Sequence, residues 1–186
     1  MLISKQIAIA YSNDLLKREI AKLEVVDKLT GLYNHIYLRN RLTEEIKRAV
    51  NFQRPCSFVL LAIDRFSEYQ DLFGHIAAEN ALIKIGVVLK NNIGETDKAA
   101  RFGDHEFALI FPERNKRQSI EVADHIRKSI EQIFAEENDL RRKLTCTGAV
   151  TENPIDGVTA DELIKKGGEI LKDAERQGGN RICYKI

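Results

Sequence analysis

Two β-type runs that meet at a short turn constrain the fold of this chain more than any other feature. The runs cover residues 98–102 and 105–111, and only Gly103 and Asp104 separate them. Glycine adopts positive φ angles freely and aspartate tolerates them, as the central residues of a tight hairpin turn require. The sequence therefore predicts an antiparallel hairpin with these two residues at its tip.

A further strand is predicted at residues 56–63, where the sequence CSFVLLAI is apolar without a break. Such a run is typical of a strand buried on both faces, so we expect it to lie in the centre of a sheet. Residues 143–150 alternate as another strand, with Leu144, Cys146 and Gly148 on one side. Residues 182–186 are predicted to form the last strand.

Apolar residues at helical spacing predict helices between these strands. The expected buried positions are Leu38, Leu42, Ile46 and Val50 in residues 36–51; Ala78, Leu82, Ile85 and Val88 or Leu89 in 75–93; and Ile120, Val122, Ile126, Ile130 and Ile133 in 117–134. A last helix should begin at Thr159 as N-cap, with Glu162 completing a capping box, and end at Gly178 and Gly179.

The order β-α-β-β-α-β behind a leading helix predicts an α+β sandwich, in which helices cover a mixed β-sheet. A chain of 186 residues suits one domain with an appendage. We place the domain at residues 27–186 and the appendage, an N-terminal helix, at residues 1–26.

Residues 1–26 carry Ile9, Leu16, Ile20 and Leu23 near heptad spacing, the pattern of a short coiled-coil seam. Asn13 lies on the same seam, where it would fix the register of a dimer, or it belongs to an N-cap in Ser12-Asn13-Asp14. The segment is therefore expected to join a homodimer or a partner signalling protein. The alternative is an arm that packs on its own domain.

Composition excludes several classes of function. The net charge of +1 gives no reason to expect nucleic-acid binding. Three cysteines without CxxC spacing indicate buried thiols in a reducing, cytoplasmic compartment and no zinc site. No uninterrupted apolar run reaches the roughly 18 residues of a membrane span, so none is expected in this chain.

Three motifs resemble those of GGDEF domains, the diguanylate cyclase family. Residues 27–34 (DKLTGLYN) are similar to its DxLTGLxNR motif, with His35 at the final Arg. Residues 62–75 resemble its DxDxF and YGH elements, and residues 101–107 (RFGDHEF) its hairpin signature. The resemblance covers about residues 27–185 and implies the palm-like fold of nucleotidyl cyclases.

In that family an acidic residue before the DxDxF turn, a backbone carbonyl, and the third residue of GGDEF hold two magnesium ions. The matching positions here are Ala62, Ile63 and His105, so both carboxylates are missing. Hard cations need oxygen ligands, and one isolated histidine is a poor magnesium ligand. We therefore expect no metal and no cofactor, and magnesium only if the chain is an active cyclase.

The nucleotide positions of the family have also changed. The guanine-reading Asn and Asp correspond to Gln70 and Glu79, each one methylene longer. The hairpin loop would supply Gly103, Asp104, His105 and Glu106, and the side chain of Asp104 stands where the family has a second glycine. Three phosphate-binding cations are replaced, at Ser67, Glu175 and Gly179. The resemblance thus implies a degenerate nucleotide site with weak affinity for GTP.

The product-inhibition motif of the family, RxxD, corresponds to residues 94–97 (GETD), which keep the Asp and lack the Arg that grips cyclic di-GMP. Three functions remain open from the sequence. The first is a degenerate regulatory or dimerising module of cyclic di-GMP signalling without catalysis. The others are an active diguanylate cyclase with displaced ligands, and a domain that binds GTP without chemistry.

Overall fold

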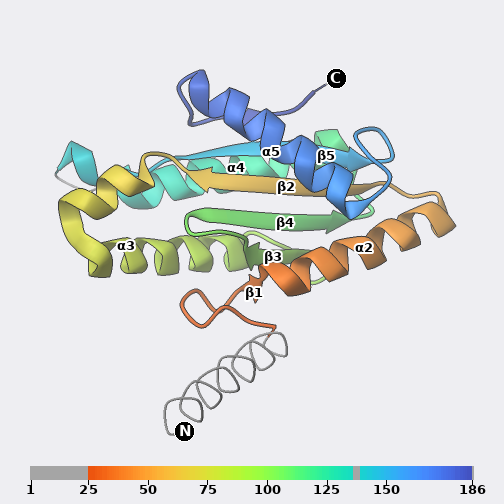
Figure 1. The fold of residues 1–186 in the computed structure, drawn as a ribbon, viewed down its shortest axis with the longest axis horizontal. Coiled ribbons are helices and arrows are strands. Elements are labelled where there is room, and N and C mark those ends of the chain that lie inside the picture. The colour runs from red at the N-terminus through yellow and green to blue at the C-terminus, as the bar shows by residue number, and fades with distance from the viewer. Residues whose placement is uncertain (1–24, 136–138, 186) are drawn as a thin grey trace, which may run out of the picture.

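The computed structural model describes residues 25–135 and 139–185 and contains one six-stranded sheet in the order β1-β3-β4-β2-β5-β6 (Figure 1). The elements are β1 (Tyr33–Asn34), α2 (His35–Phe52), β2 (Cys56–Ile63), α3 (Phe66–Asn91), β3 (Lys98–Arg101), β4 (Glu106–Pro112), α4 (Lys116–Ala135), the 3-10 turn η1 (Leu140–Arg142), β5 (Cys146–Asn153), α5 (Ala160–Arg176) and β6 (Ile182–Cys183). Residues 1–24, which include most of the predicted N-terminal helix, lie outside the described residues.

Strand β2 lies in the centre of the sheet, as its continuous apolar sequence predicted. It pairs antiparallel with β4 and with β5, so that Val59 stands between Leu109 and Val150. The outer pairs, β1 with β3 and β5 with β6, are parallel. All eight residues of β2 are buried, which explains why this strand shows no polar alternation.

Helices cover both faces of the sheet, which confirms the predicted α+β sandwich (Figure 1). One core cluster joins α3 and α4 to alternate strand residues such as Leu61 and Leu109. The other joins α2 and α5 to the intervening residues, among them Phe58 and Ile110. The alternation of side chains along each strand thus divides the core into two layers.

Two predicted core residues are on the surface instead. Val50 is 60% exposed and Ile133 is 38% exposed, while Ala49 and Phe134 are buried in their place. Val50 ends a series spaced by four residues, which exceeds the helical repeat of about 3.6, so each step rotates the position by about 40° away from the core. Ile133 follows Ile130 by three residues, which rotates it by about 60° in the other direction, and Phe134 takes the buried position. Val88 and Leu89 were the alternatives for the last buried position of α3, and Leu89 is the one that is fully buried.

The predicted tight turn at the hairpin is wrong in its geometry. Strand β3 ends at Arg101 and β4 begins at Glu106, so four residues connect them. The N–H groups of Phe102 and Gly103 both donate to the carbonyl of Glu106, at 2.8 and 3.1 Å. Neither Gly103 nor Asp104 has a positive φ. Glycine is favoured at 103 because a Cβ there would lie 2.7 Å from the carboxylate of Glu106.

Other boundaries also differ from the predictions. The helix expected at residue 75 begins earlier, at Phe66, and is interrupted at Gly74, where φ is 83°. The short strand β1 was not predicted, and the last strand holds only two residues. The predicted N-cap of α5 is confirmed, since Thr159 Oγ1 accepts from the Glu162 N–H at 3.2 Å. The Glu162 carboxylate accepts from the N–H of Val158, one residue before the N-cap residue that would complete the predicted capping box.

Helix α3 meets the length and hydropathy criteria for a membrane span, although the sequence holds no uninterrupted apolar run of that length. Glu79 and Lys84 interrupt its apolar run, which is why the sequence did not indicate it. One face of the helix belongs to the core of the domain, through residues such as Leu82 and Ile85. Length and composition alone are therefore weak evidence for a membrane segment here.

Two of the three thiols are buried, as predicted, and Cys183 is half-buried. Burial, assisted by the nearby Glu45 carboxylate, raises the pKa of the Cys56 thiol to about 12. Because the thiolate is the reactive form, Cys56 is chemically inert at neutral pH.

Candidate functional site

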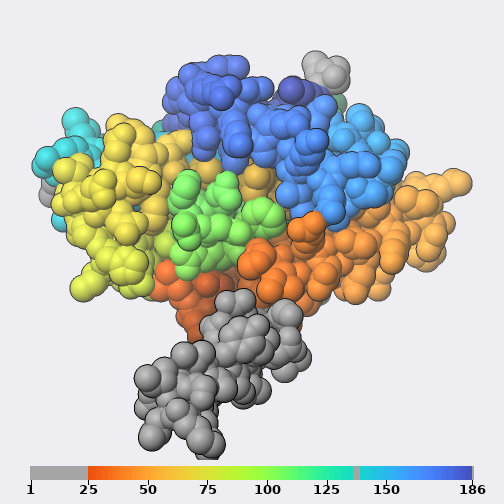
Figure 2. All heavy atoms as spheres, viewed as in Figure 1, coloured from red at the N-terminus to blue at the C-terminus, as the bar shows by residue number. Residues whose placement is uncertain are grey.

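Two adjoining cavities lie where β2, the hairpin, the start of α3 and the end of α5 converge. Their volumes are about 610 and 420 Å³, and both are lined by Phe66, Ser67 and His105. Figure 2 shows the start of α3 (yellow), the hairpin (green) and α5 (blue) meeting on one face of the molecule. We call the two together the hairpin cleft.

The first cavity contains Asp64, whose carboxylate is held by three hydrogen bonds. Thr145 Oγ1 donates to Oδ2 at 2.6 Å, Thr147 Oγ1 donates to Oδ1 at 2.6 Å, and the N–H of Asn180 donates to Oδ2 at 3.0 Å. These bonds tie the end of β2 to β5 and to the segment that follows α5. Asp64 therefore acts as a structural clamp.

The hairpin loop contributes His105, whose ring stacks on Phe66 with centroids 6.0 Å apart and planes inclined by 17°. Its backbone carbonyl accepts a hydrogen bond from the N–H of Ile63 at 3.0 Å. Asp104 lines the second cavity. Arg101 fixes the loop by donating to the carbonyls of Gly103 and Asp104.

Carboxylates dominate the charge of the first cavity. Burial raises the pKa of Glu175, and the neighbouring carboxylates of Asp64 and Glu106 raise it further, while His105 and Lys172 act in the opposite direction. A negatively charged ligand would therefore meet repulsion at the position where the family resemblance places a cation.

Arg65 is a cation that the sequence interpretation did not consider. It lines the first cavity beside Glu68 and holds a left-handed backbone conformation, with φ of 53°, at the start of α3. Non-glycine residues rarely adopt positive φ, and such strain concentrates at functional sites. No sequence pattern revealed this conformation, because it depends on how β2 enters α3.

The residues of this cleft are a poor fit for magnesium. Ala62 has no side-chain donor, His105 offers a nitrogen, and both carboxylate oxygens of Asp64 are engaged by the bonds given above. Within residues 25–135 and 139–185, no three His, Cys, Asp or Glu side chains converge as a metal-binding group. Magnesium prefers several oxygen ligands in octahedral geometry, which this set does not offer.

The two residues at the guanine positions both line the second cavity, bridged by a histidine. Gln70 Nε2 lies 3.4 Å from His75 Nδ1, and His75 Nε2 lies 3.2 Å from Glu79 Oε1. A neutral ring protonated on Nε2 would accept from the amide and donate to the carboxylate. The polar groups of Gln70 and Glu79 are thus directed toward one another, with the ring of His75 between them.

Gly179 has no room for the cation that the family resemblance places there. It has φ of +68°, and a Cβ would lie 2.8 Å from Asp64 Oδ1 and 3.0 Å from Thr147 Oγ1. The clamp around Asp64 and a side chain at position 179 therefore exclude one another in this conformation.

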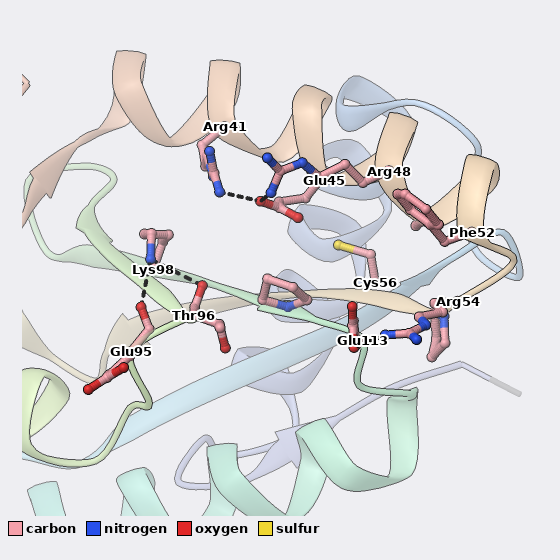
Figure 3. A pocket seen from close by; sticks show the side chains of 13 residues that line it. Arg41, Glu45, Arg48, Phe52, Arg54, Cys56, Glu95, Thr96, Lys98 and Glu113 are labelled. Atoms are coloured by element: carbon pink, nitrogen blue, oxygen red, sulfur yellow. Dashed lines mark hydrogen bonds and ion pairs between the residues drawn. The ribbon is translucent and has the colours of Figure 1, made fainter.

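A third cavity of about 610 Å³ lies between α2 and the ends of β3 and β4 (Figure 3). Its cations already have partners: Arg41 pairs with Glu45 at 2.5 Å, and Arg54 pairs with Glu113. Figure 3 shows Lys98 directed toward the 95–96 segment, where its Nζ donates to the carbonyls of residues 95–97 at 3.0 to 3.1 Å.

Asp97, which stands at the Asp of the RxxD motif in the 94–97 segment, has a structural role beside this cavity. Its side chain is fully buried, accepts from the N–H of Gly94 at 2.8 Å and pairs with Arg114 at 3.1 Å. Both contacts use Oδ2, and Oδ1 is buried without a hydrogen-bond partner among the described residues. Because the side chain is fully buried, a ligand at the surface would not reach it.

The mixed sheet covered on both faces, with a cleft beside the central hairpin, defines a palm-like domain of the nucleotidyl cyclase type. The sequence profile described as "Diguanylate cyclase, GGDEF domain" matches residues 24–181. The chain therefore belongs to the GGDEF family.

A sequence relative supports the assignment to the GGDEF family. The response regulator PleD of Caulobacter vibrioides is 28% identical over 166 residues, which cover 88% of this chain and 37% of PleD. The chain thus spans well under half of that relative's length.

Two solved structures share the fold. The coiled coil and GGDEF domain of DgcB from Caulobacter crescentus, in complex with c-di-GMP, superposes with a TM-score of 0.81 at 18% identity, covering 98% of this chain and 97% of that one. The diguanylate cyclase SiaD from Pseudomonas aeruginosa, in complex with its activator SiaC, gives a TM-score of 0.80 at 25% identity, covering 97% and 70%.

The structure brings the predicted site residues together in part. Ile63, Gln70, Glu79, Asp104 and His105 all line the hairpin cleft. Ala62 is buried within β2, Gly103 lies in the connecting loop, and Glu106 opens β4. Their roles toward a nucleotide remain predictions.

Proposed function

We propose that this chain is a degenerate GGDEF domain that has kept the fold and lost diguanylate cyclase activity. It acts in the cytoplasm as a regulatory or dimerising module of cyclic di-GMP signalling, without a metal or other cofactor. The single observation that carries the proposal is the composition of the hairpin cleft, where a carboxylate, Glu175, stands at a position that would have to bind phosphate, and the metal-binding positions lack carboxylates.

The chemistry of phosphoryl transfer supports this proposal. Such reactions depend on cations that hold the phosphates and neutralise developing charge. In the cleft Ser67 and Glu175 replace two cations. Burial, and then the neighbouring carboxylate of Asp64, raise the pKa of Glu175. Arg65 is one exposed cation at the rim, which is too little to offset these losses.

The partner of such a module is proposed to bind through residues 1–26, either as a second copy of the chain or as another signalling protein. The relatives give this idea a precedent, since the DgcB structure includes a coiled coil and SiaD is found with an activator.

Binding of GTP without turnover is the second candidate, favoured by the position of Gln70 and Glu79 in one cavity. Calorimetric titration of GTP with magnesium into the purified chain separates the candidates. We expect no saturable heat. Saturable binding that Glu79→Ala abolishes would favour the second candidate, and turnover would support an active cyclase.

Restoring the metal positions alone is expected to leave the chain inactive. The double substitution Ala62→Asp/His105→Asp supplies two carboxylates, but Ser67, Glu175 and Gly179 still leave the phosphates without cations. Each missing charge-assisted contact is worth roughly 1.5 to 3 kcal/mol, and the restored metal ligands replace none of the three.

Product formation from GTP, followed by mass spectrometry, measures the outcome. The matched control adds Ser67→Lys and Glu175→Lys to the same variant, and circular dichroism checks that each protein is folded. Robust turnover by the double variant without those lysines would show that the cations are dispensable.

Cyclic di-GMP is expected not to bind at residues 94–97. The Arg of the family motif is missing, and Asp97 is fully buried against Arg114. Calorimetry with cyclic di-GMP should therefore give no heat attributable to this segment. Tight binding that Glu95→Ala and Thr96→Ala leave intact but Asp97→Asn abolishes, in a variant that stays folded, would refute the expectation.

A further inference from the structure

The outer face of α3 carries apolar side chains where a surface helix normally carries charges. Ile76 is 77% exposed, Val87 is 51% exposed and Ile83 is 38% exposed. The helix lies at the periphery of the domain (Figure 1). At about 100° per residue these positions form a narrow stripe directly opposite the buried residues Ala78, Leu82, Ile85 and Leu89. We call Ile76, Asn80, Ile83 and Val87 the α3 seam.

The α3 seam has the spacing of a coiled-coil contact. Its four residues follow one another at intervals of four, three and four, as alternating d and a positions do. Asn80 then occupies an a position. Its side-chain amide is exposed and makes no hydrogen bond to another described residue. An asparagine at an a position fixes register and a two-stranded parallel arrangement by pairing with its symmetry mate.

The charges that flank the seam complement a second copy of the same helix. With Asn80 at position a, Glu79 is at g and Lys84 is at the following e. In a parallel pair, g of one helix faces the following e of the other, so Glu79 meets Lys84 twice across the two-fold axis. Self-complementarity of this kind is what an isologous interface requires.

We infer that the α3 seam is a self-association surface, which pairs with the α3 seam of a second copy in parallel orientation. The contact is only about two heptads long, shorter than a free coiled coil needs. However, α3 is already folded against its own domain, so association does not have to meet the cost of helix formation. The resulting dimer is weak and concentration-dependent.

A membrane surface is the competing occupant, because α3 is apolar on two faces. Interfacial helices place Lys and Arg along a polar face and large aromatic residues on the other. The α3 seam has Glu79 on one flank, Lys84 on the other and an amide in its middle, which does not fit that pattern. The inference is independent of the proposed loss of catalysis, although Glu79 also lines the second cavity of the hairpin cleft.

Sedimentation equilibrium of the full chain tests the α3 seam. The substitution Ile83→Glu is expected to raise the dissociation constant of the dimer at least about tenfold, since it places a charge in the centre of an apolar contact. The matched control Val50→Glu changes an equally apolar, 60% exposed residue on α2 and should have no effect.

The charged flanks provide a second test that depends on orientation. Glu79→Lys and Lys84→Glu should each weaken the dimer by about threefold, and the two together should restore it. Under mild oxidation Asn80→Cys should form a cross-linked dimer, whereas Lys84→Cys should not, because in the parallel register position 80 meets its own symmetry mate and position 84 does not.

Three outcomes would overturn the inference. The full chain could remain monomeric at high concentration. It could form a dimer that Leu16→Glu abolishes and Ile83→Glu leaves intact, which would place the contact in residues 1–26. It could also float with vesicles of neutral and anionic phospholipid in a manner that Ile83→Glu prevents while the protein in solution stays monomeric.

Discussion

Asp64→Ala is expected to lower the free energy of unfolding by about 3 kcal/mol, because it removes three hydrogen bonds to a charged acceptor. The bonds come from Thr145, Thr147 and the N–H of Asn180, at 2.6, 2.6 and 3.0 Å. Thr147 is fully buried, so its hydroxyl would lose its partner with limited access to water. Urea denaturation followed by circular dichroism measures the change.

Two control variants define the cause of this loss. Asp64→Asn keeps the shape and one acceptor oxygen, so it should cost less than Asp64→Ala. Asp71→Ala removes an exposed carboxylate on α3 and should change stability by less than about 0.5 kcal/mol. Equal stability of the Asp64→Ala variant and the unsubstituted chain would contradict the role of Asp64 as a structural clamp.

Phe58→Ala is expected to cost about 3 to 5 kcal/mol, the range for removing a large aromatic side chain from a packed core. Phe58 is fully buried in the central strand and lies edge to face with Phe102, at 6.2 Å between ring centroids. Gly167 of α5 packs on its ring, and a Cβ at that position would lie at ordinary van der Waals distance, 3.6 Å.

Phe52→Ala is the matched control, because the same side chain is 72% exposed at the end of α2. It should change the midpoint of thermal unfolding little, whereas Phe58→Ala should lower it by many degrees. Similar losses for both variants would mean that the two-layer core does not carry the stability assigned to it.

The parts of the fold that the sequence predicted are those whose signal is local. The strand β2 and the N-cap at Thr159 were predictable because the residues that determine each of them lie within a few positions of one another in the sequence. The exposure of Val50 was predictable from the helical repeat, because a strict spacing of four residues leaves the buried face after three steps. The exposure of Ile133 was not, because steps of three and of four are both compatible with a buried helical face. The geometry of the hairpin loop was predicted wrongly because Gly103 does not have a positive φ. The loop is closed instead by the carbonyl of Glu106, which accepts from the N–H groups of Phe102 and Gly103.

The candidate site likewise has features that the sequence predicts and features that only the structure reveals. The changes at Ala62, His105 and Glu175 are visible in the sequence because the family motifs that contain them are contiguous. The bonds of Asp64 are not visible, since they join residues 81 and 83 positions apart and one 116 positions apart. The left-handed backbone of Arg65 and the limited room at Gly179 likewise depend on the assembled cleft.

The central claim is that the hairpin cleft no longer makes cyclic di-GMP, and incubation of the purified full chain with GTP and magnesium tests it most directly. Products are separated and identified by mass spectrometry, with heat-inactivated protein as the control. The account predicts no cyclic di-GMP above that control at any protein concentration. Product that accumulates with time, in proportion to the amount of protein, would contradict it.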